Sequence, residues 1–365
     1  MIKTNLLLAV SLLLQFTVFS QADELTPREK QYRDSITKLN QSNAAIAASQ
    51  EAYNKGIELY GQKKFKEAIS AFNTSIKSDP NFTAAYYNKG VAEIEADLYK
   101  EAIQTFTDLI SKQGTYSKAY FQRGRAYQGQ NDYISSEKDY DYAIKLDPAN
   151  SKAYYNYGTL RFLQEDYNAA IKFFTKSIEL SPNDPMYYND RGSCYRMLGN
   201  YPKAIEDYET ALRKNPNLAF VLNNVGTTKK KMKDIPGALL AFNRAISVDQ
   251  NFALAYNNRG VVLVEKGSLD DAIKDFEKAL QINPKYAAAA SNLSGIYYKR
   301  KDFKRAEEYA TKAIEWDPNH TAAFVNRGMA REMLRKADDA CEDWKKADNM
   351  GSAEGKKLYS GNCSN

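Results

Sequence analysis

The sequence predicts an all-α protein, a solenoid of nine stacked helix-turn-helix repeats of 34 residues each. Three columns of residues carry this prediction, and the first is a small residue, glycine in all but one repeat, that recurs every 34 residues without insertion. An alanine or serine stands twelve residues after it, and an aromatic residue stands sixteen after it in eight of the nine repeats. So strict a period indicates identical small units packed in series. The first column consists of Gly56, Gly90, Gly124, Gly158, Gly192, Gly226, Gly260, Ser294 and Gly328.

Each column has a physical reason when the glycine is counted as position 8 of its repeat. Small residues at positions 8 and 20 let two helices approach closely, and the aromatic residue at position 24 shares a helix face with position 20. Proline at position 32 ends the second helix in six repeats, because it cannot continue the hydrogen-bond ladder. The repeats then cover residues 49–82, 83–116, 117–150, 151–184, 185–218, 219–252, 253–286, 287–320 and 321–354.

The first 22 residues have the composition of a secretory signal peptide. Lys3 precedes an apolar stretch, and Ser20, Gln21 and Ala22 form a small-x-small cleavage site. The stretch is short for a membrane span, so we expect no integral membrane segment in the mature chain. A retained membrane anchor is the alternative. We therefore expect an exported protein, periplasmic or secreted, after cleavage near residues 20–22.

Residues 23–48 are polar and lack the repeat columns. Thr26, Pro27 and Glu29 form a typical helix start, with a capping residue, proline at the first helical position and glutamate at the third. A short helix and a flexible lead-in both remain open for this segment.

The C-terminal residues 355–365 are predicted to form a cap and tail after the last repeat. A turn at Gly351 leads into a short returning helix that covers the exposed end of the array. Cys341 precedes this turn by ten residues and Cys363 follows it at a similar distance, so equal rise along the two helices brings them side by side. We expect these two cysteines to form a disulfide in an oxidising compartment, and Cys194 to be a buried free thiol.

Two further columns change together along the chain. Position 7 is arginine only in the third, fifth, seventh and ninth repeats, and position 23 is aspartate in the same four. We predict that these positions face each other across the helix pair and form a bridge that orients the two helices. The predicted pairs are Arg123 with Asp139, Arg191 with Asp207, Arg259 with Asp275, and Arg327 with Asp343.

The columns together resemble the tetratricopeptide repeat family, whose pattern has aromatic residues at positions 4 and 24, glycine at 8, alanine at 20 and proline at 32. Tyr120, Gly124, Tyr140 and Pro148 follow it in one repeat, and the resemblance covers residues 49–354. The eighth repeat departs from it most. The resemblance implies antiparallel helix pairs stacked into a right-handed superhelix. It also implies a concave groove lined by positions 2, 5, 6, 9, 12 and 13 of each first helix.

Position 6 of this implied groove is asparagine in seven of the nine repeats. A carboxamide both donates and accepts hydrogen bonds, so such a column is able to hold the backbone of an extended peptide without reading its sequence. Support of the repeat's own fold is the alternative, although asparagine is a poor helix former. The seven candidate ligand-binding asparagines are Asn54, Asn88, Asn156, Asn224, Asn258, Asn292 and Asn326.

Positions 5, 12 and 13 add aromatic and basic candidates for ligand binding. Aromatic side chains dominate the binding energy of many interfaces, with packing inside the protein as the alternative role. A basic group is suited to a carboxylate or phosphate, with a solvated surface as the alternative. The aromatic candidates at position 5 are Tyr53, Tyr87, Phe121 and Tyr155. The basic candidates are Arg196, Lys230 and Lys231.

Composition and motifs argue against several other functional classes. A net charge of +6, dispersed over 365 residues, is too small for a nucleic-acid-binding surface. The single histidine, His320, stands alone in a loop. We find no phosphate-binding glycine loop, no paired-cysteine zinc spacing and no serine elbow. We therefore expect no catalytic site, no metal and no cofactor.

These observations predict a non-enzymatic scaffold that holds an extended segment or a partner protein in the concave groove. Two alternatives stay open. One is a structural, self-assembling spacer of an envelope complex, and the other is a glycan-binding module that uses the aromatic half of the groove. The sequence does not identify the partner.

Overall fold

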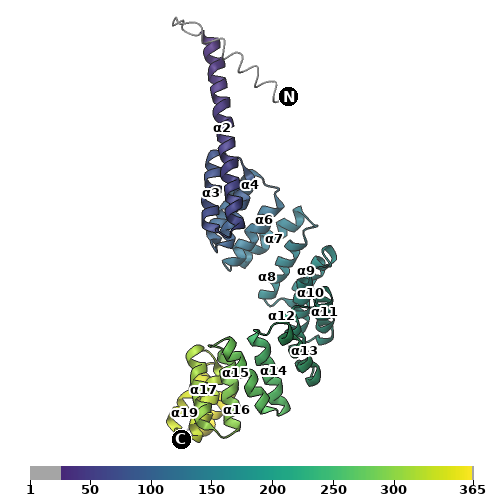
Figure 1. The fold of residues 1–365 in the computed structure, drawn as a ribbon, viewed down its shortest axis with the longest axis vertical. Helices are drawn as coiled ribbons and strands as arrows, with labels where there is room; N and C mark the ends of the chain where they lie inside the picture. Colours follow the sequence, from purple (N-terminus) through teal and green to yellow (C-terminus); the bar gives the residue numbers. More distant parts are fainter. Residues whose placement is uncertain (1–25, 364–365) are drawn as a thin grey trace. The chain divides into compact units, whose positions relative to one another are not determined.

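The structure, a computed structural model, describes residues 26–363, so the predicted signal peptide lies outside the described residues. Within this range the chain forms nineteen helices and no strand, which confirms the predicted all-α fold (Figure 1). The helices are α2 Pro27–Gly61, α3 Phe65–Ser78, α4 Thr83–Glu95, α5 Tyr99–Lys112, α6 Ser117–Gly129, α7 Tyr133–Leu146, α8 Ser151–Leu163, α9 Tyr167–Leu180, α10 Pro185–Met197, α11 Tyr201–Lys214, α12 Ala219–Lys231, α13 Ile235–Val248, α14 Ala253–Lys266, α15 Leu269–Ile282, α16 Ala287–Lys299, α17 Phe303–Trp316, α18 Thr321–Met333, α19 Ala337–Asn349 and α20 Ala353–Asn362.

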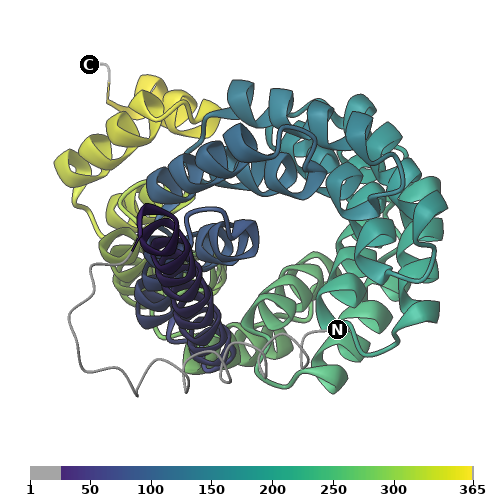
Figure 2. The same cartoon turned by 90° about the horizontal axis from the view of Figure 1, so that it is seen from above.

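The helices alternate as the first and second helices of the repeats. From α4 to α18, each even-numbered helix begins at the first residue of a predicted repeat, as α4 does at Thr83. A tight turn then leads to the odd-numbered second helix, which packs against the first. Figure 2 shows helix pairs of this kind side by side.

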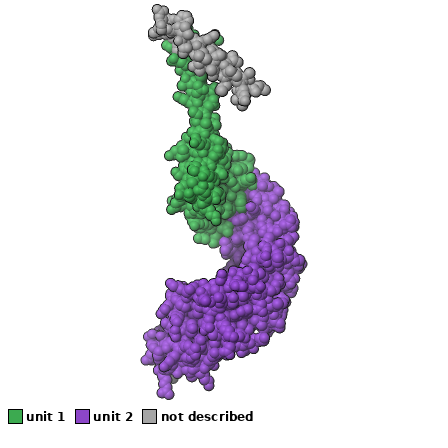
Figure 3. All heavy atoms as spheres, viewed as in Figure 1, with its two compact units in different colours: residues 1–139 green, residues 140–365 purple. Residues whose placement is uncertain are grey.

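The chain divides into two compact units, residues 1–139 and residues 140–365, and the division falls within α7 (Figure 3). Within each unit, neighbouring first helices contact one another, as α2 does with α4 and α10 does with α12. Among the described second helices other than α7, no two make such a contact. The first helices therefore lie on the inner side of the curve within each unit, and their exposed side chains are the ones available to a ligand there.

The glycine and aromatic columns meet inside each repeat. A Cβ atom added to Gly260 would lie only 2.7 Å from the ring of Phe276, and one added to Gly226 would lie 2.6 Å from Phe242. Both rings are fully buried. The aromatic ring at position 24 thus packs directly on the glycine of its own repeat, rather than filling only the space between repeats. Glycine is required there because the second helix carries a large ring into the contact.

The eighth repeat solves the same packing problem with smaller residues. Ser294 replaces the glycine, Ala310 replaces the ring, and both are completely buried. The Ser294 hydroxyl donates a 2.7 Å hydrogen bond to the backbone carbonyl of Ala306, at position 20. The third repeat makes the reverse bond, in which Ser136 at position 20 donates to the carbonyl of Gly124 at 2.8 Å. A buried hydroxyl is therefore tolerated in either column because the facing backbone accepts its proton.

The segment before the first repeat is helical and continuous with it. Helix α2 is 35 residues long and includes both the lead-in and the first helix of the first repeat. Thr26 caps its start, and Thr26 and Glu29 form a reciprocal capping box. The structure thus selects the helix over the flexible lead-in, and the helix is longer than expected. Most of its first two-thirds is exposed, including the apolar side chains of Tyr32, Leu39 and Ile46.

A returning helix follows the last repeat, as the sequence predicts. Gly351 makes the turn with a φ of +84°, a conformation that favours glycine. The Ser352 hydroxyl then caps α20 by accepting a hydrogen bond from the backbone of Gly355. Leu358 of α20 packs against the buried side chains of Phe324 and Val325. Helix α20 therefore covers apolar surface that the last repeat would otherwise expose.

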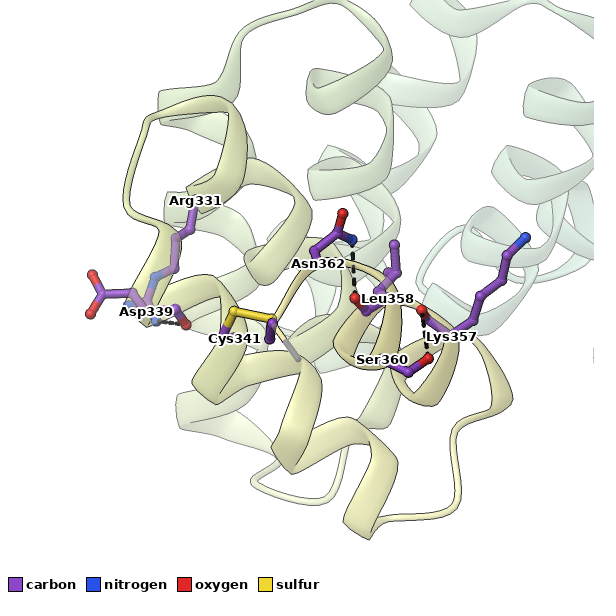
Figure 4. Close-up of a disulfide and its surroundings, with 8 residues drawn as sticks. Arg331, Asp339, Cys341, Lys357, Leu358, Ser360 and Asn362 are labelled. Carbon is purple, nitrogen blue, oxygen red and sulfur yellow. Dashed lines mark hydrogen bonds between the residues drawn. A yellow bond between two sulfur atoms is a disulfide. The ribbon is translucent and has the colours of Figure 1, made fainter. Parts of the chain in front are cut away.

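The end of α20 returns to α19. Cys341 and Cys363 have Cα atoms 5.7 Å apart, within the range that a disulfide spans, and their sulfur atoms are joined (Figure 4). The pairing expected from the sequence is thus the one the geometry brings together. Cys194 is free and buried, as expected.

Candidate functional site

Positions 5 and 6 of the first helices form two adjacent columns with different exposure. In the second unit, position 5 is buried in five successive repeats, with exposed fractions of 3–6%. Position 6 is half-buried in the repeats from α8 to α18, so its side chain stays accessible from the inner surface. The five buried residues at position 5 are Asn189, Asn223, Asn257, Ser291 and Val325, and the first four carry a side-chain oxygen.

The asparagine column is a hydrogen-bonded ladder that runs from repeat to repeat. The Nδ2 group of Asn258 donates to Oδ1 of Asn223 at 2.9 Å, and Asn292 donates to Asn257 at 3.0 Å. Asn224 donates to the same position of the preceding repeat, to Asn189 at 3.0 Å. Each bond joins position 6 to position 5 of the repeat before it, 35 residues earlier. One amide proton of these asparagines therefore stabilises the stacking of the repeats.

In the first unit and at the ends of the column, the hydrogen bond made by position 6 changes with the acceptor that position 5 of the preceding repeat supplies. Asn88 donates to the Tyr53 hydroxyl at 2.9 Å, because tyrosine replaces asparagine as the acceptor. Asn326 donates to the backbone carbonyl of Ser291 at 3.0 Å. The remaining predicted asparagines bond within their own helices: Asn156 donates to the Lys152 carbonyl, and Asn54 accepts from Gln50.

The rest of each position-6 amide faces the inner surface. An asparagine side chain has two N–H donors and an oxygen with two lone pairs, and the ladder uses one donor. Asn224 and Asn292 are each partly exposed, and neither Oδ1 atom is buried without a hydrogen-bond partner. These amides therefore retain an acceptor and a second donor for a ligand on the inner surface.

The predicted aromatic anchors pack against other rings. Tyr53 lies with its ring centroid 4.9 Å from that of Phe82, and Tyr155 stacks on Tyr187 at 4.8 Å. Tyr87 packs against Phe106 and Tyr116 in the same way. Phe121 is only 9% exposed. As anchors they remain a prediction, and the three tyrosines are only partly exposed to a ligand.

Asp190 is the one carboxylate in the position-6 column. Its Oδ2 atom accepts a 2.6 Å hydrogen bond from the Tyr155 hydroxyl, and its Oδ1 atom accepts one of 2.8 Å from Asn189. Burial raises the pKa of Asp190, while these two hydrogen bonds act to lower it. Burial and the Asp190 charge together raise the pKa of Tyr155, so the tyrosine stays protonated and remains the donor.

The three basic candidates have different environments. Lys230 forms an ion pair with Glu265 at 3.0 Å, so part of its charge is already compensated. Arg196 donates a long hydrogen bond of 3.4 Å to the Tyr208 hydroxyl. Lys231 is exposed and forms no ion pair among the described residues. The structure therefore leaves Arg196 and Lys231, rather than all three, available for an anionic group.

The predicted arginine–aspartate bridges are confirmed in all four repeats. Each arginine donates from Nε and a terminal nitrogen to the two oxygens of its aspartate, at 2.6–2.9 Å. Three of them also reach the preceding repeat, as Arg191 does when it donates to Thr175 at 3.1 Å. They orient the two helices of one repeat as expected. In these three repeats they also join neighbouring repeats, which the sequence argument did not include.

The link between positions 5 and 6 of neighbouring repeats was missed, although the sequence contains a signal for it. Asparagine at position 6 follows asparagine, serine or tyrosine at position 5 of the repeat before in most cases. All three residue types offer an oxygen acceptor. A search for complementary residues 35 positions apart, rather than along one column, would have found the ladder.

Among residues 26–363 no group of three or more histidine, cysteine or acidic side chains is arranged to hold a metal ion. His320 lies beside Asp317, with 3.7 Å between its Nδ1 atom and the carboxylate. Within the same residues, no helix has both the length and the apolar character that a membrane crossing needs.

Comparison with known families identifies the repeat. One model described as a tetratricopeptide repeat matches residues 53–117, 121–185 and 226–287, together more than half of the chain. Two other models with the same description match residues 185–218 and residues 263–326. Among curated protein sequences, none matches this chain significantly.

Solved structures share the fold. A tetratricopeptide repeat protein from Parabacteroides merdae is 21% identical, with a TM-score of 0.56 over 67% of this chain and 97% of that one. PilF of Pseudomonas aeruginosa is 19% identical, with a TM-score of 0.51 over 59% of this chain and 98% of that one. Part of a repeat protein from Cytophaga hutchinsonii is 19% identical, with a TM-score of 0.52 over 66% of this chain and 98% of that one. These similarities concern the fold alone.

Proposed function

The chain belongs to the tetratricopeptide repeat family, and we propose that it is a non-enzymatic scaffold that holds an extended peptide segment of a partner protein. The segment lies along the inner surface of the first helices in the second unit. Half-buried amides hold its backbone, and Arg196 and Lys231 attract an acidic group of the same partner.

One observation carries this proposal. The amides of Asn224 and Asn292 are held in place by the ladder, and each keeps an acceptor and a donor that the ladder does not use. Asn258 is held in the same way, and its Oδ1 atom also accepts a 3.4 Å hydrogen bond from Asn257, which leaves it one lone pair and one donor. Fixed polar groups lose little conformational freedom on binding, which favours association. A row of such groups is able to pair with donors and acceptors of an extended backbone. Because backbone groups are common to all sequences, we expect broad sequence tolerance.

The test begins with a ligand-side change, which leaves the protein intact. Peptides of twelve residues that bind residues 23–365 are selected from a random library, and their affinities are measured by fluorescence anisotropy. Methylating single backbone nitrogens removes donors one at a time. We expect several positions at which this weakens binding by about fivefold to tenfold, since one hydrogen bond contributes about 1 kcal/mol. Equal affinity for methylated and unmethylated peptides would exclude backbone binding.

A matched pair of variants separates the ligand contact from the ladder. Asn292→Ala removes an amide that faces the inner surface together with its ladder bond. Asn257→Ser instead changes the buried residue that accepts this bond and that donates a long 3.4 Å hydrogen bond to Asn258, and serine already occupies the same position one repeat later, at Ser291. We expect weaker peptide binding for Asn292→Ala and near-normal binding for Asn257→Ser. Glycan-array binding, or oligomers that grow with concentration in the absence of any selected peptide, would instead favour the alternative roles.

We also propose that the protein acts outside the cytoplasm. The apolar leader, which lies outside the described residues, and the Cys341–Cys363 pair both support this location, since disulfides persist in oxidising compartments. Fractionation of cells that produce the full chain, with mass spectrometry of the mature N-terminus, tests it. A cytoplasmic protein that retains Met1 would contradict it.

A further inference from the structure

Asp190 interrupts a column in which the neighbouring repeats carry amides, and the stacking of repeats does not require a carboxylate there. The first unit contains the matched contact: Asn88 meets the Tyr53 hydroxyl at 2.9 Å, as Asp190 meets the Tyr155 hydroxyl at 2.6 Å. Both contacts join position 6 to a tyrosine at position 5 of the preceding repeat. An asparagine at position 190 would therefore be able to make the same bond with the donor and acceptor exchanged.

The Asp190 carboxylate also has no basic partner among the described residues, unlike the other acidic side chains of the interior. Each of the four buried aspartates at position 23 is paired with an arginine, and buried Glu93 lies 3.5 Å from Lys89. The charge of a second acid, Asp184, adds to the effect of burial in raising the pKa of Asp190. A half-buried carboxylate next to another acid is unfavourable in the free protein. Its location on the inner surface makes a positive charge from a ligand the natural compensation.

The surroundings of Asp190 suit a cation on a long apolar stem. Positions 2, 6 and 13 of a first helix lie on one face, so Met186 lies one turn before Asp190 and Met197 two turns after it on the same face of α10. Met197 is 48% exposed, and Leu163 at the same position of the preceding repeat is 51% exposed. Methionine adapts to varied apolar shapes, and lysine and arginine bury their methylene stems while their charged ends stay polar. The carboxylate still has free lone pairs beside its two hydrogen bonds.

We propose that Asp190 binds a lysine or arginine side chain of the bound peptide, and so adds one position of sequence preference to a backbone-binding surface. The charged group pairs with the carboxylate, and the stem lies on Met197 and Leu163. The proposal rests on the proposed function. It differs from it in predicting a specific residue in the ligand.

The probes are acetylated, amidated and fluorescently labelled peptides of eleven alternating alanine and serine residues. Their central residue is lysine, arginine, norleucine or glutamate, and norleucine keeps the stem of lysine without its charge. Anisotropy titrations in 0.15 M salt measure their affinities for residues 23–365. We expect lysine and arginine peptides to bind about fivefold to tenfold more tightly than the norleucine peptide. In Asp190→Asn we expect that preference to disappear, with the norleucine peptide bound as before.

Two variants control for charge and fold. Glu209→Gln makes the same charge change at an exposed site of α11 and leaves the preference intact. Thermal unfolding tests whether the acid serves the fold: Asp190→Asn should unfold at an equal or higher temperature, and Asn88→Asp at a lower one. A lower unfolding temperature for Asp190→Asn would overturn the proposal by showing that the carboxylate is needed for stacking.

The outcomes also separate this proposal from the proposed function. If the peptides bind but lysine, arginine and norleucine are equivalent, the lysine or arginine preference is wrong and the backbone-binding scaffold stands. If none of the four peptides binds at a concentration of about 1 mM, both proposals fail together.

Discussion

Positions 7 and 23, which face each other across the two helices of a repeat, are filled by an arginine–aspartate pair in four repeats and by two apolar residues in others. In the seventh repeat Arg259 forms a two-point hydrogen-bonded pair with Asp275, whose side chain is 7% exposed. In the sixth repeat Val225 and Ala241 occupy the same positions and are buried without any charge. A buried acid is stable only with its partner, so arginine and aspartate appear together or not at all.

This pairing predicts a non-additive pair of substitutions. Asp275→Ala leaves the Arg259 guanidinium partly buried without its acceptor, and we expect a loss of about 2–3 kcal/mol. Adding Arg259→Val recreates the apolar pair of the sixth repeat and should restore much of that loss. Urea unfolding and amide hydrogen exchange of α14 and α15 measure both effects. Additive losses in the double variant would contradict the prediction.

At the scale of elements, every repeat turns between its two helices through one residue with positive φ. These residues stand at position 15, with φ between 58° and 85°. Only two of the nine are glycine, so seven turns place a side chain in a region that L residues disfavour. They are Lys63, Asp97, Asn131, Glu165, Gly199, Lys233, Gly267, Lys301 and Arg335.

The strain in these turns predicts opposite effects for two opposite substitutions. Lys301 is exposed with a φ of 61°, and Lys301→Gly should stabilise the eighth repeat by about 0.5–1 kcal/mol. Gly267 has a φ of 85° and nothing near its Cα that a methyl group would strike. Gly267→Ala should therefore destabilise by about 1 kcal/mol through backbone strain alone. Denaturation midpoints of the two variants test this, and a destabilised Lys301→Gly protein would refute it.

At the scale of the whole molecule, a linear array has ends at which no further repeat covers the apolar surface. At the C-terminal end α20 takes that place, with Leu358 on the cluster that contains Phe324 and Val325. The Cys341–Cys363 pair ties the end of this helix to α19. The cap is short, so a covalent link contributes a large part of its stability.

The cap predicts a specific redox behaviour. Closing a loop with a sequence separation of 22 should contribute about 3 kcal/mol to the stability of the C-terminal end. The protein unfolded without reductant should show one reactive thiol, that of Cys194, and three after reduction. Cys363→Ser should increase hydrogen exchange in α20 and leave the first unit unchanged. Three reactive thiols before reduction would show that the pair is not formed.

Much of the fold could be predicted from the sequence because nearly the same pattern of small and aromatic residues occurs in nine successive repeats. The period, the small and aromatic columns and the arginine–aspartate pairs all describe contacts within one repeat, where helix geometry alone relates the residues. The sequence did not decide whether the lead-in before the first repeat is helical. Residues 26–48 have no apolar column to indicate a packed helix, and their helix extends from one already formed by the first repeat, which avoids the cost of nucleation.

The candidate site was predicted less completely. The asparagine column was found, but its hydrogen bonds to the preceding repeat were not, since residues 35 positions apart meet only after the first helices stack. Tyr155 and Phe121 were singled out as ring-bearing candidates from their place in a column, but how far each is packed by neighbouring rings depends on three helices at once.

The sequence by itself determined the repeat unit, its helix pairs and the residues that pack within it. Those features depend on spacing along one or two helices, and spacing is read from the chain. Only the tertiary structure decided which half of each amide stabilises stacking and which half stays accessible. It also showed that Asp190 stands on the inner surface without a basic partner. Both depend on the rotation of one helix against the next, which the packing of the side chains sets.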